Sequence, residues 1–150
     1  PVPAITHTTV DAQIKRDVGT AATTSDWLVY LCDDHVLGTA FFWNLREEIG
    51  DGNMNGPVIG VPRRWRKGSE EINLCPLNNG IATDEAASYC GGHAGVFRRT
   101  SIQELPWSVA PHHPNWDLYH SRMLVARGHW IFQLEECHIY DVDPNGTPWK

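Results

Sequence analysis

The sequence contains no long uncharged hydrophobic run. A membrane-spanning helix needs roughly 18 consecutive apolar residues, and the longest such run here, Trp27 to Cys32, is only as long as one β-strand. Basic residues are also few, because 12 lysines and arginines face 18 aspartates and glutamates, for a net charge of −6. We therefore expect a soluble chain without a membrane span. We do not expect a nucleic acid as the partner, since duplex binding needs a net basic face.

Several motifs for catalysis and cofactor binding are missing. There is no phosphate-binding loop, no dinucleotide fingerprint, no Gly-x-Ser-x-Gly elbow and no His-Glu-x-x-His zinc motif. The cysteines form no Cys-x-x-Cys pair, which finger-type zinc sites need. We therefore predict neither a cofactor nor a bound metal.

The cysteines are even in number and widely spaced: Cys32, Cys75, Cys90 and Cys137. Cys32 and Cys137 belong to apolar stretches typical of buried strands, whereas Cys75 and Cys90 flank a segment rich in Pro, Asn and Gly. We predict the disulfides Cys32–Cys137 and Cys75–Cys90, and from them a secreted, extracellular protein. The alternative is four reduced, buried cysteines in a cytosolic protein.

A length of 150 residues suits one domain. Residues 1–26, rich in Thr and Ala, predict an N-terminal arm, followed by a single β-rich domain over 27–150. The dibasic pair Lys15-Arg16 could be a cleavage site that ends a pro-segment at Arg16. It could also be a charged turn of a helix from Asp11 to Val18, which we favour.

Short β-branched and aromatic segments alternate with turn residues along the rest of the chain. We expect strands at 27–32, 35–43, 58–61 and 93–99, and a hairpin of 122–127 with 129–142 around Gly128. We expect one helical turn at 44–49, short helices at 83–88 and 101–105, and an ordered loop at 106–121. The pattern predicts a mainly β fold, a small antiparallel sandwich or barrel with one or two short helices. An α+β fold is the alternative.

Two groups of residues suit a binding site. The basic run of Arg63, Arg64, Trp65, Arg66 and Lys67 sets positive charge around one indole. Arginine forks bind phosphate, sulfate or carboxylate groups, and an indole stacks on sugars. The alternative is a solvated loop whose arginines pair with the surplus acids. The second group consists of aromatic residues from the expected loop at 106–121: Trp107, Trp116 and Tyr119. They either extend this binding surface or plug the ends of the sheet.

The same segment carries residues suited to acid–base catalysis. His113, His120 and Asp117 lie within ten residues, and two histidines could act as general base and general acid on an ester or phosphodiester. Metal binding and a purely structural role are the alternatives. Glu136 could add a carboxylate for glycosidic chemistry, although we favour a salt bridge between the Glu135-Glu136 pair and Arg122 or Arg127.

The composition is typical of small secreted effectors and lectin-like modules of microbes, the kind used in virulence. We expect a non-enzymatic recognition protein that binds a glycan, an anionic surface or a host protein. The alternative is a small secreted hydrolase that acts on a glycosidic or phosphodiester substrate, and a third class is a toxin or inhibitor with one rigid loop.

Overall fold

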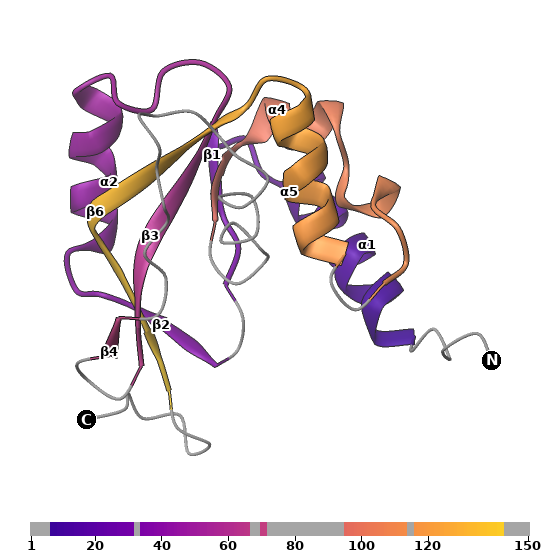
Figure 1. Cartoon of the computed structure of the whole chain (residues 1–150), viewed down its shortest axis with the longest axis horizontal. Helices are drawn as coiled ribbons and strands as arrows, with labels where there is room; N and C mark the ends of the chain where they lie inside the picture. The colour runs from indigo at the N-terminus through magenta and orange to yellow at the C-terminus, as the bar shows by residue number, and fades with distance from the viewer. Residues whose placement is uncertain (1–6, 32–33, 67–69, 72–94, 114–115, 143–150) are drawn as a thin grey trace.

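The chain folds as an α+β protein with a curled, mixed sheet that forms a half-barrel (Figure 1). The computed structural model describes residues 7–31, 34–66, 70–71, 95–113 and 116–142. The predicted antiparallel sandwich or barrel is wrong, and the alternative of an α+β fold is confirmed.

The described helices and strands alternate along the chain. The helices are α1 (His7–Ala22), α2 (Phe41–Gly50), α4 (Arg99–Glu104), the 3-10 helix η1 (Trp107–Val109) and α5 (Trp116–Ala126). The strands are β1 (Trp27–Val29), β2 (His35–Leu37), β3 (Val58–Arg66), β4 (Glu70–Glu71), β5 (Val96–Arg98) and β6 (Trp130–Asp141).

The sheet has the strand order β1-β5-β3-β6-β2, and β4 pairs with β3. The two long central strands, β3 and β6, run parallel, whereas the other strand pairs are antiparallel. Parallel neighbours need a long crossover connection, and the segment between β3 and β6 holds β5, α4 and α5. The hairpin predicted around Gly128 is therefore wrong, because β6 pairs with strands from the first half of the chain.

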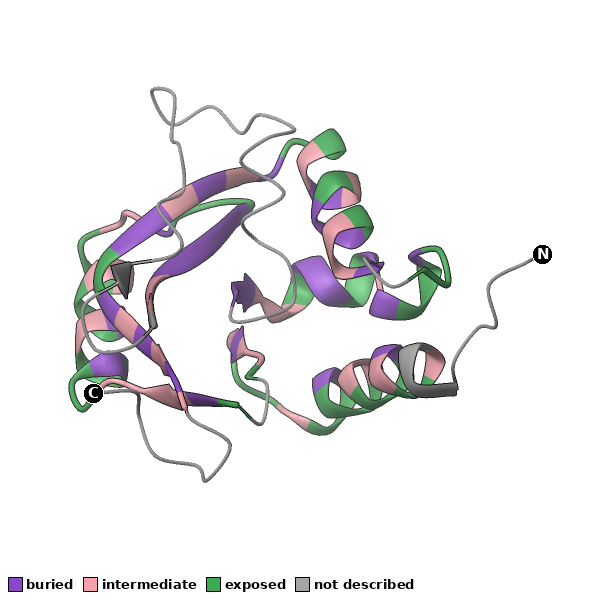
Figure 2. Cartoon of the chain, turned by 60° about the horizontal axis from the view of Figure 1, so that its bottom comes forward, coloured by how far each residue is buried: buried purple, intermediate pink, exposed green. Residues whose placement is uncertain are grey.

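Both faces of the sheet carry a hydrophobic core. Alternate residues of β3 point to opposite faces, so Val58 belongs to one core and Ile59 to the other. The Val58 core contains Phe41 and Leu45 of α2, and the Ile59 core contains residues of α4, η1 and α5. Figure 2 shows a long buried stretch in β3, whereas β6 and the helices alternate buried residues with more exposed ones.

Gly60 allows the α2 side of the sheet to pack closely. A Cβ atom at this position would lie 2.8 Å from the Met54 methyl group and 2.9 Å from a Leu134 methyl group. Next to it, the pairing of β3 with β6 shifts from Pro62↔Leu134 to Arg63↔His138. The residues of β6 between these two pairs form a bulge, which re-aims the end of the strand.

Two local predictions of strands fail because tertiary burial overrides β-propensity. Phe41 to Trp43 begins helix α2, where Phe41 and Leu45 are buried one turn apart. Trp116 to Ala126 is a helix rather than a loop and a strand. Strand β3 continues past Pro62 to Arg66. The helix expected at 101–105 is confirmed as α4, and the one expected at 83–88 lies outside the described residues.

Cys137 is a free, buried cysteine, so the predicted Cys32–Cys137 disulfide is wrong. Its thiol points to the α2 core and donates a long hydrogen bond to the Phe41 carbonyl oxygen, with Sγ and O 3.8 Å apart. Burial raises the pKa of the Cys137 thiol to about 12, because the thiolate would lose its hydration. Cys137 therefore acts as a small hydrophobic residue. Cys32, Cys75 and Cys90 lie outside the described residues.

Helix α1 is longer than the predicted helix from Asp11 to Val18 and packs against η1 and α4. The Asp17 carboxylate accepts the backbone N–H groups of Trp107 at 2.7 Å and Ser108 at 3.0 Å. The Arg16 guanidinium lies 4.8 Å from the ring centres of Trp107 and Trp116. The arm is therefore attached to the core, and its cleavage after Arg16 stays a prediction. As expected from the sequence, no helix in the described parts of the chain could span a membrane.

Candidate functional site

The structure separates the residues that the sequence groups within 107–120. Trp107 is fully buried and Trp116 almost so, and both belong to the core shared by η1 and α5. Neither indole offers a surface to a ligand. Tyr119 is exposed, and its ring meets His113 edge to face at 5.4 Å between ring centres.

His120 is also part of the core. Its side chain is fully buried and its ring stacks on Trp107 with ring centres 3.9 Å apart. The Nε2 atom lies 2.8 Å from the Leu105 carbonyl oxygen, to which a neutral imidazole donates its proton. Burial lowers the pKa of His120 to about 4, because the imidazolium would lose its hydration. This histidine is a structural, neutral side chain in the folded state.

We predict that His120 makes the protein sensitive to acid. In the folded state its pKa is about 4, below its ordinary value of 6.5, so between these values the unfolded chain binds more protons. Stability is therefore lost as the pH falls from 6.5 towards 4, by on the order of 3 kcal/mol from this group. Burial also lowers the pKa of His129, so this histidine acts on the stability in the same direction.

The measurement is urea unfolding of the wild type and of His120→Gln between pH 7 and pH 4. The glutamine amide can still donate to the Leu105 carbonyl oxygen, but it does not titrate. The stability curve of the variant should fall less steeply over this range, although the variant starts lower. Two parallel curves would contradict the prediction.

The other predicted catalytic residues do not converge. Asp117 lies in the first turn of α5, where its carboxylate accepts the N–H group of Leu118. Glu136 lies on β6 and lines a different pocket, which none of His113, Asp117 and His120 reaches. In the pocket that Glu136 lines, formed by described residues, the predicted acid–base residues therefore do not meet.

Strand alternation divides the basic run, which is not a loop. Arg63 and Trp65 lie on one face of β3 and pair in register with His138 and Tyr140 of β6, whereas Arg64 points to the opposite face. The Arg63 guanidinium lies 3.3 Å from the Glu135 carboxylate. Arg63 and Arg64 are thus paired with acids, as in the alternative that the sequence left open. Nothing is described for the side chain of Arg66.

Arg64 forms a largely buried ion pair with Asp141. Its Nε atom donates to Oδ1 at 2.7 Å and Nη2 to Oδ2 at 3.2 Å, a bidentate geometry. The Nε2 atom of His35 lies 3.2 Å from the same Oδ1. Three strands thus contribute to one charged cluster, which joins β2, β6 and β3.

Four side chains form a continuous half-buried patch on the other face of these strands; we call it the β3–β6 face, made of Arg63, Trp65, His138 and Tyr140. The Arg63 guanidinium lies 5.5 Å from the Trp65 ring centre, and Trp65 lies 5.7 Å from His138. The rings of His138 and Tyr140 follow at 6.3 Å. A row of flat rings therefore runs across two strands.

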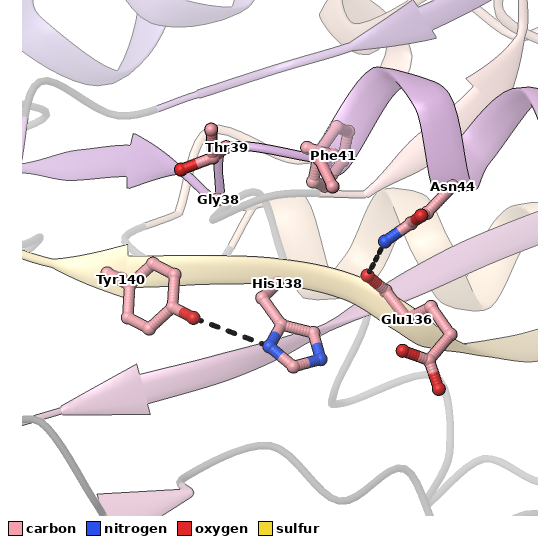
Figure 3. Close-up of a pocket in the computed structure, with 8 residues that line it drawn as sticks. Gly38, Thr39, Phe41, Asn44, Glu136, His138 and Tyr140 are labelled. Carbon is pink, nitrogen blue, oxygen red and sulfur yellow. Dashed lines mark hydrogen bonds between the residues drawn. The ribbon is translucent and has the colours of Figure 1, made fainter.

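A small pocket of about 170 Å³ adjoins this row, where β2 ends and α2 begins (Figure 3). Glu136, His138 and Tyr140 line it from β6, and Thr39 and Asn44 line it from the opposite side. The Asn44 amide donates to the Glu136 carbonyl oxygen at 2.6 Å, and Glu136 is an exposed residue. The Tyr140 hydroxyl lies 3.4 Å from His138 Nδ1.

Trp65 and Glu136 are among the residues predicted from the sequence to form a site, whereas the places of His138 and Tyr140 in this row were not predicted. Glu136, His138 and Tyr140 are alternate residues of one predicted strand, and alternate residues of a strand share a face. This spacing was the signal in the sequence that could have grouped them. Pairing with Trp65 could not be foreseen, since it depends on the parallel register of β3 and β6. Within the described residues, no group of three or more His, Cys, Asp or Glu could hold a metal ion.

Comparison with known protein families gives no matching family model, and a search of curated proteins gives no match either. The fold and the geometry of the side chains are therefore the basis for the functional argument.

Proposed function

We propose that the protein is a recognition protein that binds a neutral saccharide on the β3–β6 face. The observation that carries the proposal is the row of Trp65, His138 and Tyr140, which leads into a polar pocket. Flat rings stack on the apolar faces of sugars, while nearby hydroxyl, amide and carboxylate groups bind sugar hydroxyls. Glu136, Asn44 and Thr39 supply such groups at the pocket.

Charge favours a neutral ligand over an anionic one. Arg63 contacts Glu135, and Arg64 is paired with Asp141 on the opposite face. An anionic ligand would have to compete with these carboxylates, and the chain as a whole carries a charge of −6. The pocket is too small for a whole ligand, so the saccharide would lie along the ring row with one group in the pocket. Secretion would bring the protein into contact with such a glycan. Secretion itself stays a prediction, and the free thiol of Cys137 gives it no support.

Binding can be measured by intrinsic tryptophan fluorescence with neutral oligosaccharides of glucose, xylose, mannose and N-acetylglucosamine. We expect one of these series to change the emission in a saturable way. Trp65→Ala should then weaken binding about tenfold or more, since one aromatic contact contributes about 0.5–1.5 kcal/mol beyond its buried area.

Trp43→Ala is the matched control, because this indole is 66% exposed on α2, away from the β3–β6 face. It should leave the affinity unchanged. Absence of binding across all four series would refute the proposal, as would equal losses in the two tryptophan variants.

A further inference from the structure

Ser101 and His129 form a buried hydrogen-bonded pair outside the β3–β6 face. The Ser101 Oγ atom lies 2.8 Å from His129 Nε2. The other ring nitrogen, Nδ1, lies 3.0 Å from the Leu124 carbonyl oxygen, which can only accept a hydrogen bond. Nδ1 therefore carries the proton in the neutral ring, and Nε2 is left as the acceptor of the Ser101 hydroxyl proton. This is the tautomer that a histidine needs to act as a base toward a serine.

The fold holds this histidine in place at the end of α5. Gly128 adopts φ +89, a left-handed conformation that ends the helix. The N–H group of His129 then donates to the same Leu124 carbonyl oxygen that accepts from its ring, at 3.1 Å. Ser101 lies on α4, which Pro106 prevents from extending. Two helix segments thus fix the pair, whose residues lie far apart in the sequence.

The pair borders a cavity of about 460 Å³, which is within the range of small-molecule sites. Arg98, Thr100 and Glu104 line the cavity together with Ser101 and His129. The Arg98 side chain is held by two backbone carbonyl oxygens, those of Gly56 and Met54, each at 3.1 Å. Arg98 therefore brings a fixed positive charge to the wall of the cavity that Ser101 also lines.

We propose that Ser101 and His129 are a nucleophile–base pair that hydrolyses a small carboxylic ester bound in this cavity. In the first step the Ser101 Oγ atom forms a bond to the ester carbonyl carbon and its proton passes to His129 Nε2. The carbon–oxygen bond to the alcohol breaks, and the alcohol leaves with that proton. In the second step water attacks the acyl-serine, its proton passes through His129 to the Ser101 oxygen, and the carboxylic acid is released.

The charges around the pair suit this chemistry. Arg98 lines the same cavity, and in this proposal its guanidinium stabilises the negative charge that develops on the carbonyl oxygen. Burial has the largest effect on the pKa of His129 and lowers it, so the ring stays a free base at neutral pH. The hydrogen bond to the Leu124 carbonyl oxygen and the charge of Glu104 favour the imidazolium form, whereas Arg127 opposes it.

The test is covalent labelling of the full chain with a fluorophosphonate, followed by mass spectrometry of the peptides. The reagent reacts with an activated serine hydroxyl and not with an ordinary one. We expect one adduct per chain, on Ser101, and hydrolysis of p-nitrophenyl acetate that the adduct blocks. Ser101→Ala should lose the adduct, and its hydrolysis rate should fall by about 100-fold or more.

Two further variants separate catalysis from folding. Ser108→Ala removes an exposed serine of η1 and should keep both the label and the activity. His129→Gln should slow labelling about 100-fold while circular dichroism shows a folded chain. If that variant does not fold, the pH dependence of labelling is measured in the wild type instead. The labelling rate should fall as the pH is lowered, with a midpoint below pH 6.5. An unlabelled wild type, or equal labelling in Ser101→Ala, would overturn the proposal. Neither result bears on saccharide binding at Trp65.

Discussion

Replacing Trp107 with alanine should lower the free energy of unfolding by about 3–5 kcal/mol, the largest effect of any single tryptophan variant. The indole is fully buried and makes ring contacts with Tyr30, Phe97, Trp116 and His120. It also lies beneath the Arg16 guanidinium, so that its loss would weaken the packing of α1 against η1. The cavity cannot collapse easily, because its walls come from several different elements.

Guanidinium chloride unfolding, followed by circular dichroism, measures this effect. Trp43→Ala is the matched control, since it removes the same side chain from the exposed surface of α2 and should change the stability by less than about 0.5 kcal/mol. Losses of similar size in the two variants would mean that Trp107 does not have the central place in the core that the structure gives it.

Replacing Asp141 with asparagine should cost about 3–5 kcal/mol, because it leaves the Arg64 charge largely buried without its carboxylate. The side chains of Arg64 and Asp141 are only 14% and 9% exposed. His35, which is fully buried beside the same carboxylate, also loses a charged neighbour. The destabilisation should therefore spread over β2, β3 and β6.

The exposed pair of Arg63 and Glu135 provides the control. Glu135→Gln removes the carboxylate that contacts Arg63, the residue before Arg64 in β3, and should cost less than about 1 kcal/mol. A double-mutant cycle adds a second check, since Arg64→Met combined with Asp141→Asn should cost less than the sum of the two single changes. Additive losses would show that the two side chains do not interact.

The sequence predicted individual elements better than their arrangement. Helix α4 and the strand near 96–98 follow from local signals, namely Pro106 and the run Val96-Phe97. The helical turn expected at 44–49 lies within α2. The first residues of this helix were predicted as a strand because Phe41-Phe42-Trp43 has high β-propensity, and only burial of Phe41 against the sheet decides for a helix. The half-barrel could not be predicted, since the parallel pairing of β3 with β6 joins residues far apart in the chain.

The candidate sites show the same limit. Trp65 and Glu136 were identified by residue type, and the structure places them near each other through β6. Trp107, Trp116 and His120 have the residue types of a binding or catalytic site, yet their burial makes them core residues. Ser101 and His129 carry no local motif, because only the ends of α4 and α5 bring them together. The chemistry of a residue is visible in the sequence, but its exposure and its partners are not.

The order of the strands has a consequence for synthesis. The last described strand, β6, is the neighbour of both β3 and β2, which are made long before it. Until β6 leaves the ribosome, β2 has no partner in the sheet and β3 shows an open edge on one side, a surface that favours aggregation. The decisive folding step therefore follows the synthesis of β6, and we expect a nascent chain without β6 to depend on chaperones.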